Sequence, residues 1–189
     1  MNRIIRHAFE FAKVSGLTKV CMSDKSNAMP QGHALWQRVF REVAAEYPKI
    51  QATHQFIDAL ALLMIKDPGQ FEVIVTNNLF GDIITDLGGA LQGGLGMAAS
   101  GNIHPGRTSL FEPVHGSAPK YAGKNLANPV GAILSAALLL ETVGWSAEAA
   151  RIEAAVAAAV AAGQGTQDIG GSLGTRETGD WIAAQIRKQ

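Results

Sequence analysis

Strand-like and helix-like segments alternate through the first half of this chain, and that order limits the fold more than any other feature. Apolar residues recur at helical spacing over residues 2–15, 32–47 and 57–65. Short strand-like runs separate or follow these segments at TKVCMS (18–23), IQATHQF (50–56) and FEVIVT (71–76). Strands that alternate with helices are typical of a sheet covered by helices, so we predict an α/β sandwich.

A glycine-rich stretch follows at residues 88–106. It contains seven glycines, a composition that suits tight turns and close approach of the backbone. It matches neither a Walker loop nor a GxGxxG motif between strand and helix, so a phosphate-binding cradle and a plain loop both stay open. We predict a division into residues 1–93 and 94–189. In the second portion we expect helices over residues 130–143, 146–162 and 176–188.

Composition argues against several classes of partner. Lys and Arg number 16, as do Asp and Glu, so no net charge attracts nucleic acid or an anionic membrane. The longest apolar run, residues 131–140, is far shorter than the ~20 residues that cross a bilayer. Cys21 is the only cysteine, and we expect a buried strand residue rather than a reactive thiol. We therefore expect a cytoplasmic protein without nucleic-acid or membrane partners.

Two aspartates lie four residues apart in VTNNLFGDIITDL (75–87). On a helix, Asp82 and Asp86 project from one face, where their charges repel each other. Such a pair can lie on a solvated face, share a proton or bind a divalent metal. We expect a helix that opens at Gly81, just after an apolar strand, and ligands gather at such strand ends in α/β sheets. Mg²⁺ or Mn²⁺ suits these oxygen ligands.

Two further residues follow strand-like runs in the same way. Asp58 lies just past IQATHQF and could be a third metal ligand or a surface aspartate. Lys25, in SDKSNAM, could point into a cleft, where a nearby metal would make its ammonium give up a proton more readily. Each residue is also consistent with an ordinary surface position.

Four spaced motifs, DKSN, DALAL, TNNLFGDIITDL and LFEPVHGSAPKYAGKNLANP, occur in this order. Together they resemble the β-decarboxylating dehydrogenases, the family of isocitrate, 3-isopropylmalate and tartrate dehydrogenases. The resemblance covers the carboxyl-terminal half of a family member. It implies a three-layer α/β/α sandwich, truncated at the amino terminus. It also implies oxidation of a 2-hydroxy acid by NAD or NADP, followed by loss of CO₂ with the help of Mg²⁺ or Mn²⁺.

The resemblance assigns roles to residues in the first portion, 1–93, as the metal, substrate and dimer-interface part. Asp82 and Asp86 are implied metal ligands from one subunit, and Asp58 is a ligand from its dimer partner. Lys25 resembles the proton-transfer lysine, also contributed across the dimer. Asn27 resembles a polar residue near the substrate. A lysine beside a metal that polarises the hydroxyl is suited to acid–base chemistry.

The second portion, 94–189, resembles the nucleotide-binding part, with EPVHGSAP as the adenosine-binding loop. The implied cofactor contacts in this portion are His115, Gly116, Ser117, Ala118, Lys120, Tyr121, Asn128 and Asp168. A lysine at position 120 favours the 2′-phosphate of NADP by charge, whereas NAD-dependent relatives usually carry an aspartate there. Because Ala127 and the DIGG turn resemble the NAD-dependent branch, the choice between NAD and NADP stays open.

The half-length match also limits the expected activity. The amino-terminal residues of the family that clamp the substrate carboxylates have no counterpart here, and the arginines of this chain are scattered. Without such a clamp much of the positioning of the substrate is lost. We expect a homodimer with shared active sites, or association with a separate amino-terminal chain. The rival hypothesis is a non-catalytic remnant or partner subunit that keeps the metal and dinucleotide sites.

Overall fold

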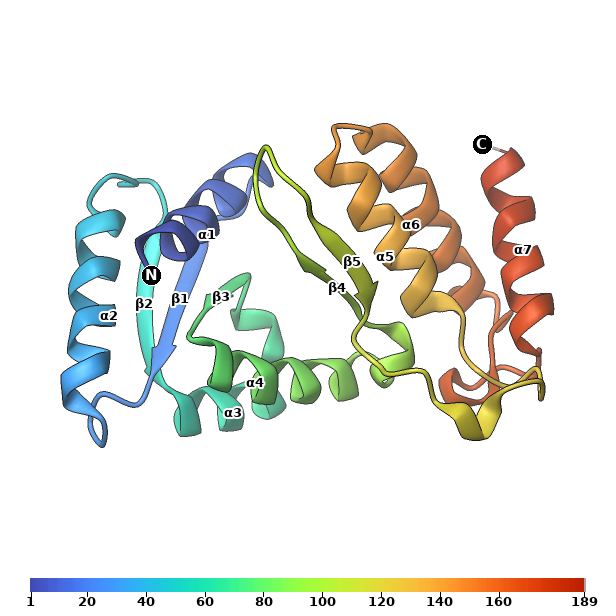
Figure 1. The fold of residues 1–189 in the computed structure, drawn as a ribbon, viewed down its shortest axis with the longest axis horizontal. Coiled ribbons are helices and arrows are strands. Elements are labelled where there is room, and N and C mark those ends of the chain that lie inside the picture. Colours follow the sequence, from blue (N-terminus) through green and yellow to red (C-terminus); the bar gives the residue numbers. More distant parts are fainter. Residues whose placement is uncertain (189) are drawn as a thin grey trace. The chain divides into compact units, whose positions relative to one another are not determined.

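The computed structural model describes residues 1–188, and the chain divides into two compact units, residues 1–88 and 89–189 (Figure 1). The predicted boundary after residue 93 lies close to this division, while the roles assigned to the two portions remain predictions. The elements that begin in the first unit are α1 (Asn2–Val14), β1 (Lys19–Asp24), α2 (Pro30–Ala44), β2 (Gln51–Phe56), α3 (Ile57–Lys66), η1 (Pro68–Gln70), β3 (Val73–Val75) and α4 (Asn78–Leu91).

A parallel sheet forms the centre of the first unit. Its strand order is β2-β1-β3, and the register pairs Asp24 with Phe56 and Met22 with Val75. Because the three strands run in the same direction, their carboxyl ends meet at one edge of the sheet. The residues that follow β1, β2 and β3 therefore leave the sheet from the same edge, which is where the predicted catalytic and metal residues begin.

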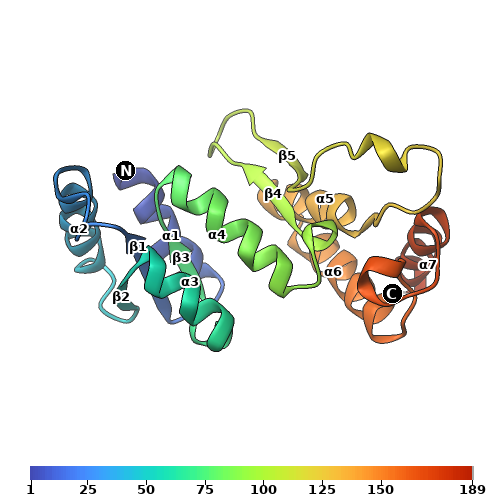
Figure 2. The same ribbon diagram turned by 90° about the horizontal axis from the view of Figure 1, so that it is seen from below.

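Helices cover both faces of this sheet. Figures 1 and 2 show α1 and α2 on one side of the sheet and α3 and α4 on the other. Val20 and Met22 of β1 belong to a core shared with α1 and α2, whereas Cys21 belongs to a core with α3 and α4. This alternation is the period-two pattern of a strand buried on both sides. The three-layer α/β/α arrangement predicted from the sequence is confirmed. Cys21 is buried as expected, and burial raises the pKa of its thiol.

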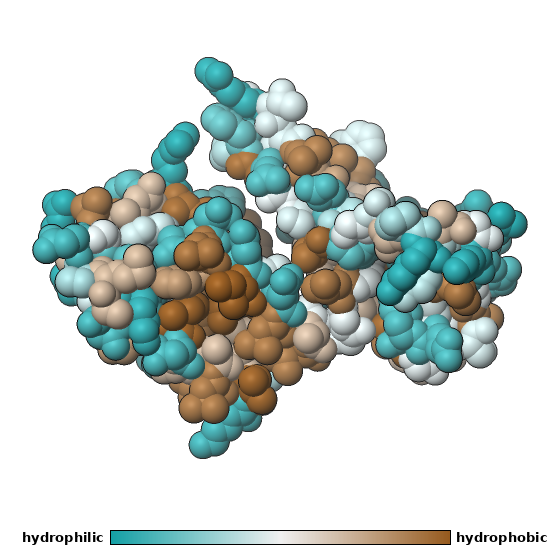
Figure 3. Space-filling model, turned by 60° about the horizontal axis from the view of Figure 1, so that its bottom comes forward, coloured by the Kyte–Doolittle hydropathy of each residue, from teal (hydrophilic) through white to brown (hydrophobic). Residues whose placement is uncertain are grey.

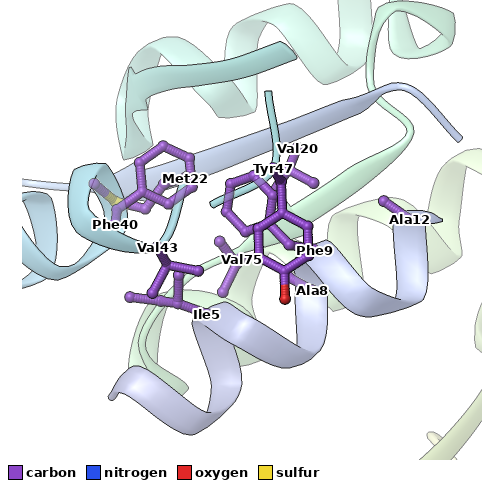
Figure 4. Close-up of a cluster of buried hydrophobic side chains, with 10 residues drawn as sticks. All are labelled: Ile5, Ala8, Phe9, Ala12, Val20, Met22, Phe40, Val43, Tyr47 and Val75. Atoms are coloured by element: carbon purple, nitrogen blue, oxygen red, sulfur yellow. The ribbon is translucent and has the colours of Figure 1, made fainter. Parts of the chain in front are cut away.

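The larger core of the first unit is built around Phe9 of α1. This side chain has no exposed surface, and its ring lies 5.5 Å from Phe40 and 5.1 Å from Tyr47, measured between centroids (Figure 4). Aromatic pairs in this distance range stabilise a core beyond the area that they bury. Truncation of a buried phenylalanine costs about 3–5 kcal/mol, so this cluster is a main source of the stability of the unit.

The second unit combines a β-hairpin with three long helices. Its elements are η2 (Leu95–Met97), β4 (Ala99–Asn102), β5 (Leu110–Pro113), η3 (Pro119–Tyr121), α5 (Val130–Thr142), α6 (Ser146–Ala161), η4 (Gln167–Ile169) and α7 (Thr175–Lys188). Strands β4 and β5 are antiparallel, with Ala99 opposite Pro113. The predicted helices are confirmed.

Small residues let the elements of the second unit approach closely. Ala155 and Ala159 of α6 are buried in a core with Val130 of α5 and Ile182 of α7. At Gly131, a Cβ atom would lie only 3.1 Å from the carbonyl oxygen of residue 96. The alanine and glycine content of this half therefore serves close packing of helices.

Two sequence predictions differ from the structure. Helix α4 begins at Asn78 rather than at Gly81, because the side chain of Asn77 accepts a hydrogen bond from the backbone N–H of Phe80 at 3.0 Å and caps the helix. The glycine-rich stretch also contains β4, which was expected to be turn or loop. Within residues 1–188, no helix has both the length and the apolar character required to cross a membrane.

Candidate functional site

Lys25 and Asp58 form an ion pair at the carboxyl edge of the sheet. The Lys25 Nζ atom lies 2.6 Å from Asp58 Oδ1, and the side chains are 25% and 67% exposed. The pairing of Asp24 with Phe56 across β1 and β2 brings the two residues together. The hydrogen bond from the Lys25 ammonium holds the pKa of the Asp58 carboxyl below its usual value. Two residues that sequence analysis treated separately are therefore neighbours.

The loop after β1, which carries Lys25 and the exposed Asn27, is held by buried side chains. Asp24 is 1% exposed, and its Oδ1 atom accepts a hydrogen bond from the Ser26 backbone N–H at 3.0 Å and lies 2.9 Å from His54 Nε2. Burial alone raises the pKa of the Asp24 carboxyl, but the hydrogen bonds from Ser26 and His54 outweigh it. The net pKa therefore lies below its usual value.

Asp82 and Asp86 both lie exposed on α4, just after β3. The side-chain amide of Asn78 donates a hydrogen bond to Asp82 Oδ1 at 3.2 Å. Among residues 1–188, no group of three His, Cys, Asp or Glu side chains is arranged to hold a metal ion. The predicted site takes Asp58 from a second copy, so one chain is expected to supply only the other two ligands. The metal assignment remains a prediction.

Exposed apolar side chains lie on the same helices as these aspartates. Leu62 and Ile65 of α3 are 64% and 62% exposed, and Leu79 and Ile83 of α4 are 64% and 58% exposed. We call these four residues the α3–α4 apolar face. Figure 3 shows hydrophobic residues gathered on the side of the first unit that α3 and α4 form. Contiguous apolar surface of this kind marks an interaction site more often than an isolated exposed leucine does.

The second unit contains a cavity of about 920 Å³. Its lining includes residues 125–128 after β5 and η3, and residues 167–168 and 171–174 before α7. The predicted nucleotide residues among its lining are His115, Ala118, Tyr121, Asn128 and Asp168. The volume lies within the range of small-molecule and cofactor sites. Segments that are distant in the sequence therefore meet around one cavity, as the nucleotide prediction requires.

Hydrogen bonds fix the polar side chains of this cavity. Asn128 Nδ2 donates to Asp168 Oδ2 at 3.0 Å, and the hydroxyl of Thr166 donates to the other oxygen of Asp168 at 2.5 Å. Asn128 Oδ1 accepts from the backbone N–H of Val130 at 2.9 Å. A Cβ atom at Gly96 would lie 2.9 Å from Asn128 Cβ, so glycine is needed at this position for the pair to fit. Hydrogen bonds within the chain thus position the two predicted adenosine contacts.

The remaining predicted nucleotide residues are not part of the cavity lining. Gly116, Ser117 and Lys120 are exposed, and the Lys120 Nζ atom lies 4.9 Å from the centroid of the Tyr121 ring. His115 donates from Nδ1 to the carbonyl oxygen of Gly116 at 2.9 Å, so its Nε2 atom can accept a hydrogen bond. Gly116, Ser117 and Lys120 are near lining residues in the sequence. The cofactor roles of these three residues and of His115 remain predictions.

Asn125, which was not predicted from the sequence, ties the cavity wall to α7. Asn125 has a positive φ of 55°, its side-chain oxygen accepts from the Arg176 backbone N–H at 2.9 Å, and its amide donates to Glu177 at 2.8 Å. Asn125 therefore satisfies backbone groups at the start of α7 from a remote loop. An asparagine in a polar loop gives little indication of this contact, because α7 begins fifty residues later.

Comparison with known proteins identifies the family. A family model described as isocitrate/isopropylmalate dehydrogenase matches residues 1–182. This chain belongs to the isocitrate/isopropylmalate dehydrogenase family. It is 49% identical over 188 residues to 3-isopropylmalate dehydrogenase of Corynebacterium glutamicum and 48% identical over 187 residues to that of Rhodococcus jostii, in both cases over 98% of this chain. The resemblance stated from the sequence motifs is confirmed.

Solved structures of this family share the fold. The crystal structure of isocitrate dehydrogenase from Methylococcus capsulatus matches 98% of this chain with a TM-score of 0.93 and 40% identity. A β-decarboxylating dehydrogenase from Thermococcus kodakarensis matches 99% of the chain with a TM-score of 0.89 and 40% identity. The chain covers 56% and 55% of those two chains and 54% of the two curated relatives. It therefore corresponds to about half of a family member, the carboxyl-terminal half as predicted.

Proposed function

We propose that this chain supplies the metal and dinucleotide sites for oxidative decarboxylation of a 2-hydroxy acid, such as 3-isopropylmalate, isocitrate or a tartrate-like acid, with NAD or NADP. The cavity of the second unit is the observation that carries this proposal. It has the size of a cofactor site, and the paired Asn128 and Asp168 offer a donor and an acceptor to a nucleotide base.

The acidic residues of the first unit fit a hard divalent cation. Asp82 and Asp86 of α4 offer exposed carboxylate oxygens one helical turn apart, which suits Mg²⁺ or Mn²⁺. In the proposed site these two residues come from one copy, and Asp58 comes from the other. When bound, the cation supplies positive charge to the substrate oxygens and the nicotinamide supplies a hydride acceptor.

The proposed proton transfer belongs to Lys25. As a neutral amine, its Nζ atom would accept the hydroxyl proton of the acid during oxidation. The ammonium so formed would return that proton to the substrate carbon that loses CO₂. The Oδ1 atom of Asp58 lies 2.6 Å from the Lys25 Nζ atom and orients it. We propose that Asp58 also contacts the substrate. Asn27, exposed on the same loop, is the proposed polar contact of the substrate.

The α3–α4 apolar face supports a homodimer with shared active sites. Its four exposed apolar residues lie on the helices that carry Asp58, Asp82 and Asp86. Burying this face against a second copy removes apolar area from water and places acidic residues of both copies at one interface. A separate amino-terminal chain is the alternative partner. Because basic and acidic residues are equal in number, the net charge favours neither nucleic acid nor a membrane as a partner. The cytoplasm remains the proposed location.

The choice between NAD and NADP depends on the surroundings of Lys120. Its ammonium lies over the Tyr121 ring, exposed and outside the cavity lining. An exposed ammonium at this position attracts a 2′-phosphate, which favours NADP by charge. Ala127 and the DIGG turn resemble the NAD-dependent branch, so NAD and NADP both stand as proposed cofactors.

The second candidate function is a partner subunit or non-catalytic remnant that binds metal and dinucleotide. The chain spans 54% of the length of the curated relatives. The two candidates share their binding sites and differ in turnover.

A turnover assay separates these candidates. The protein is mixed with Mn²⁺, NAD⁺ or NADP⁺ and each candidate acid in turn, and formation of reduced nicotinamide is followed by absorbance. Reduction with one of the acids supports the enzyme. Binding of nucleotide and Mn²⁺ without reduction supports the second candidate, and failure of the nucleotide to bind contradicts both.

A further inference from the structure

His33 contacts the backbone of the residue that the proposed function assigns to proton transfer. The backbone N–H of Lys25 donates a hydrogen bond to His33 Nδ1 at 2.8 Å. His33 is 7% exposed and lies in the first turn of α2, so this contact is largely shielded from water. A backbone N–H can only donate, and Nδ1 must therefore carry a lone pair rather than a proton.

The other polar groups of Lys25 are also occupied. Its carbonyl oxygen accepts hydrogen bonds from the backbone N–H groups of Ala28 and Met29 at 3.0 and 2.8 Å, and its ammonium pairs with Asp58. Because these contacts close the loop on one side, the bond to His33 fixes the remaining backbone group. Its loss would leave the Lys25 N–H without its partner and free the loop to move.

The ring of His33 has a second contact, which offers a competing explanation for its burial. It lies edge-on to Phe80 of α4, with 5.6 Å between ring centroids. A histidine kept only for packing would be replaceable by another aromatic ring. A histidine kept for its Nδ1 acceptor would be replaceable by asparagine, whose side-chain oxygen occupies a similar position.

We propose that His33 is a positioning residue that holds the Lys25 loop through its Nδ1 acceptor and so directs the Lys25 ammonium toward Asp58. The role of Lys25 in this inference rests on the proposed function, whereas the hydrogen bond itself does not. The nearest comparable groups, Asp24 and Gln37, hold the following residue, Ser26, by its N–H and its hydroxyl. His33 alone among these three side chains accepts from Lys25.

A matched pair of variants distinguishes the hydrogen bond that His33 accepts from the packing of its ring against Phe80. His33→Phe keeps an aromatic ring against Phe80 and removes the acceptor, and His33→Asn keeps an acceptor and removes the ring. Hydrogen exchange of the Lys25 amide is measured by NMR in both variants and in the unchanged protein. We expect exchange about tenfold faster in His33→Phe and within about threefold of the original rate in His33→Asn. Equal rates in all three proteins, or the reverse order, would overturn the proposal.

The unchanged protein provides a test that does not depend on folding of a variant. A nitrogen–nitrogen coupling through the hydrogen bond between the Lys25 amide and His33 Nδ1 is expected in NMR spectra of ¹⁵N-labelled protein. A protonated Nδ1, shown by its ¹⁵N chemical shift, would contradict the proposal. If the protein reduces nicotinamide, His33→Phe is expected to lower kcat about tenfold while the KM for the nucleotide stays the same. If no nicotinamide is reduced, the proposed enzyme fails, and the exchange rates still decide the role of His33.

Discussion

The two units differ in how completely one chain builds each candidate site. In the second unit, Asn128 and Asp168 are hydrogen-bonded to each other and line one cavity built from a single chain. In the first unit, Asp58, Asp82 and Asp86 are exposed, and within residues 1–188 no three acidic or histidine side chains form a metal cluster. Nucleotide binding is therefore expected of a single chain, and metal binding of an assembly.

The substitution with the largest expected effect tests whether nucleotide binding in the cavity depends on the stability of the first unit. Phe9→Ala removes the ring at the centre of the core that α1 and α2 share, and is expected to lower the free energy of unfolding by about 3–5 kcal/mol. The affinity for ADP, measured by calorimetry while the protein is still folded, is expected to stay within about twofold. Val14→Ala, at an exposed position of the same helix, is the control for stability. A parallel loss of ADP affinity would show that the units are not independent in this respect.

A double substitution in the first unit tests whether its aspartates bind a divalent metal. Asp82→Asn with Asp86→Asn keeps the size of both side chains and removes both charges, so Mn²⁺ affinity is expected to fall about a hundredfold or more with little change in fold. Titration with Mn²⁺ followed by electron paramagnetic resonance measures the loss. Asp180→Asn, an exposed aspartate of α7, is the control. An unchanged titration curve in the double variant would remove the metal assignment and leave a solvated pair of aspartates.

A single charge reversal in the second unit tests which residue selects between NADP⁺ and NAD⁺. Lys120→Asp replaces an ammonium that attracts a 2′-phosphate with a carboxylate that repels it, so the ratio of NADP⁺ to NAD⁺ affinity is expected to fall about tenfold. Calorimetric titration with each cofactor gives this ratio. Lys124→Asp carries the same charge change four residues away. If both variants change the ratio equally, the cofactor is selected by the overall electrostatic potential of this surface and not by a contact with Lys120.

The smallest expected effect concerns the contact between the cavity wall and α7. Glu177→Ala removes the carboxylate that accepts from Asn125, so the loop at residues 125–128 is expected to be held less firmly and ADP affinity to fall about threefold. Glu148→Ala, also in the first turn of a helix, is the matched control. Equal affinities for ADP in the two variants would mean that this contact stabilises α7 without affecting the cavity.

The sequence was most informative where local pattern alone decides the structure. Apolar periodicity predicted the helices of both units, and the short apolar runs predicted β1 and β3, because these elements depend mainly on which residues are buried. Asn77 could have been recognised as a helix cap ahead of Gly81, since asparagine is among the preferred capping residues. Strand β4 was missed because its glycine and small residues lack the β-branched signal and gain their structure from pairing with β5.

Contacts between distant residues account for what the sequence could not reveal. The pairs Asp24–His54 and Lys25–Asp58 follow from the register of β1 against β2, which no single segment encodes. The bond from Lys25 to His33 depends on the path of a short loop. Sequence motifs could name candidate residues through family resemblance, whereas the side chains that hold them in place became visible only in three dimensions.

The most direct test of the central claim is the affinity of dinucleotide for the cavity of the second unit. A Cβ atom at Gly96 would approach Asn128 to 2.9 Å, whereas one at Gly179 of α7 would meet nothing within 4 Å. Calorimetric titration with NADP⁺ and NAD⁺ is therefore performed on the unchanged protein, on Gly96→Ala and on Gly179→Ala. We expect one dinucleotide per chain, bound about tenfold more weakly by Gly96→Ala and normally by Gly179→Ala. Equal binding by all three proteins, or no binding by the unchanged protein, would contradict the account.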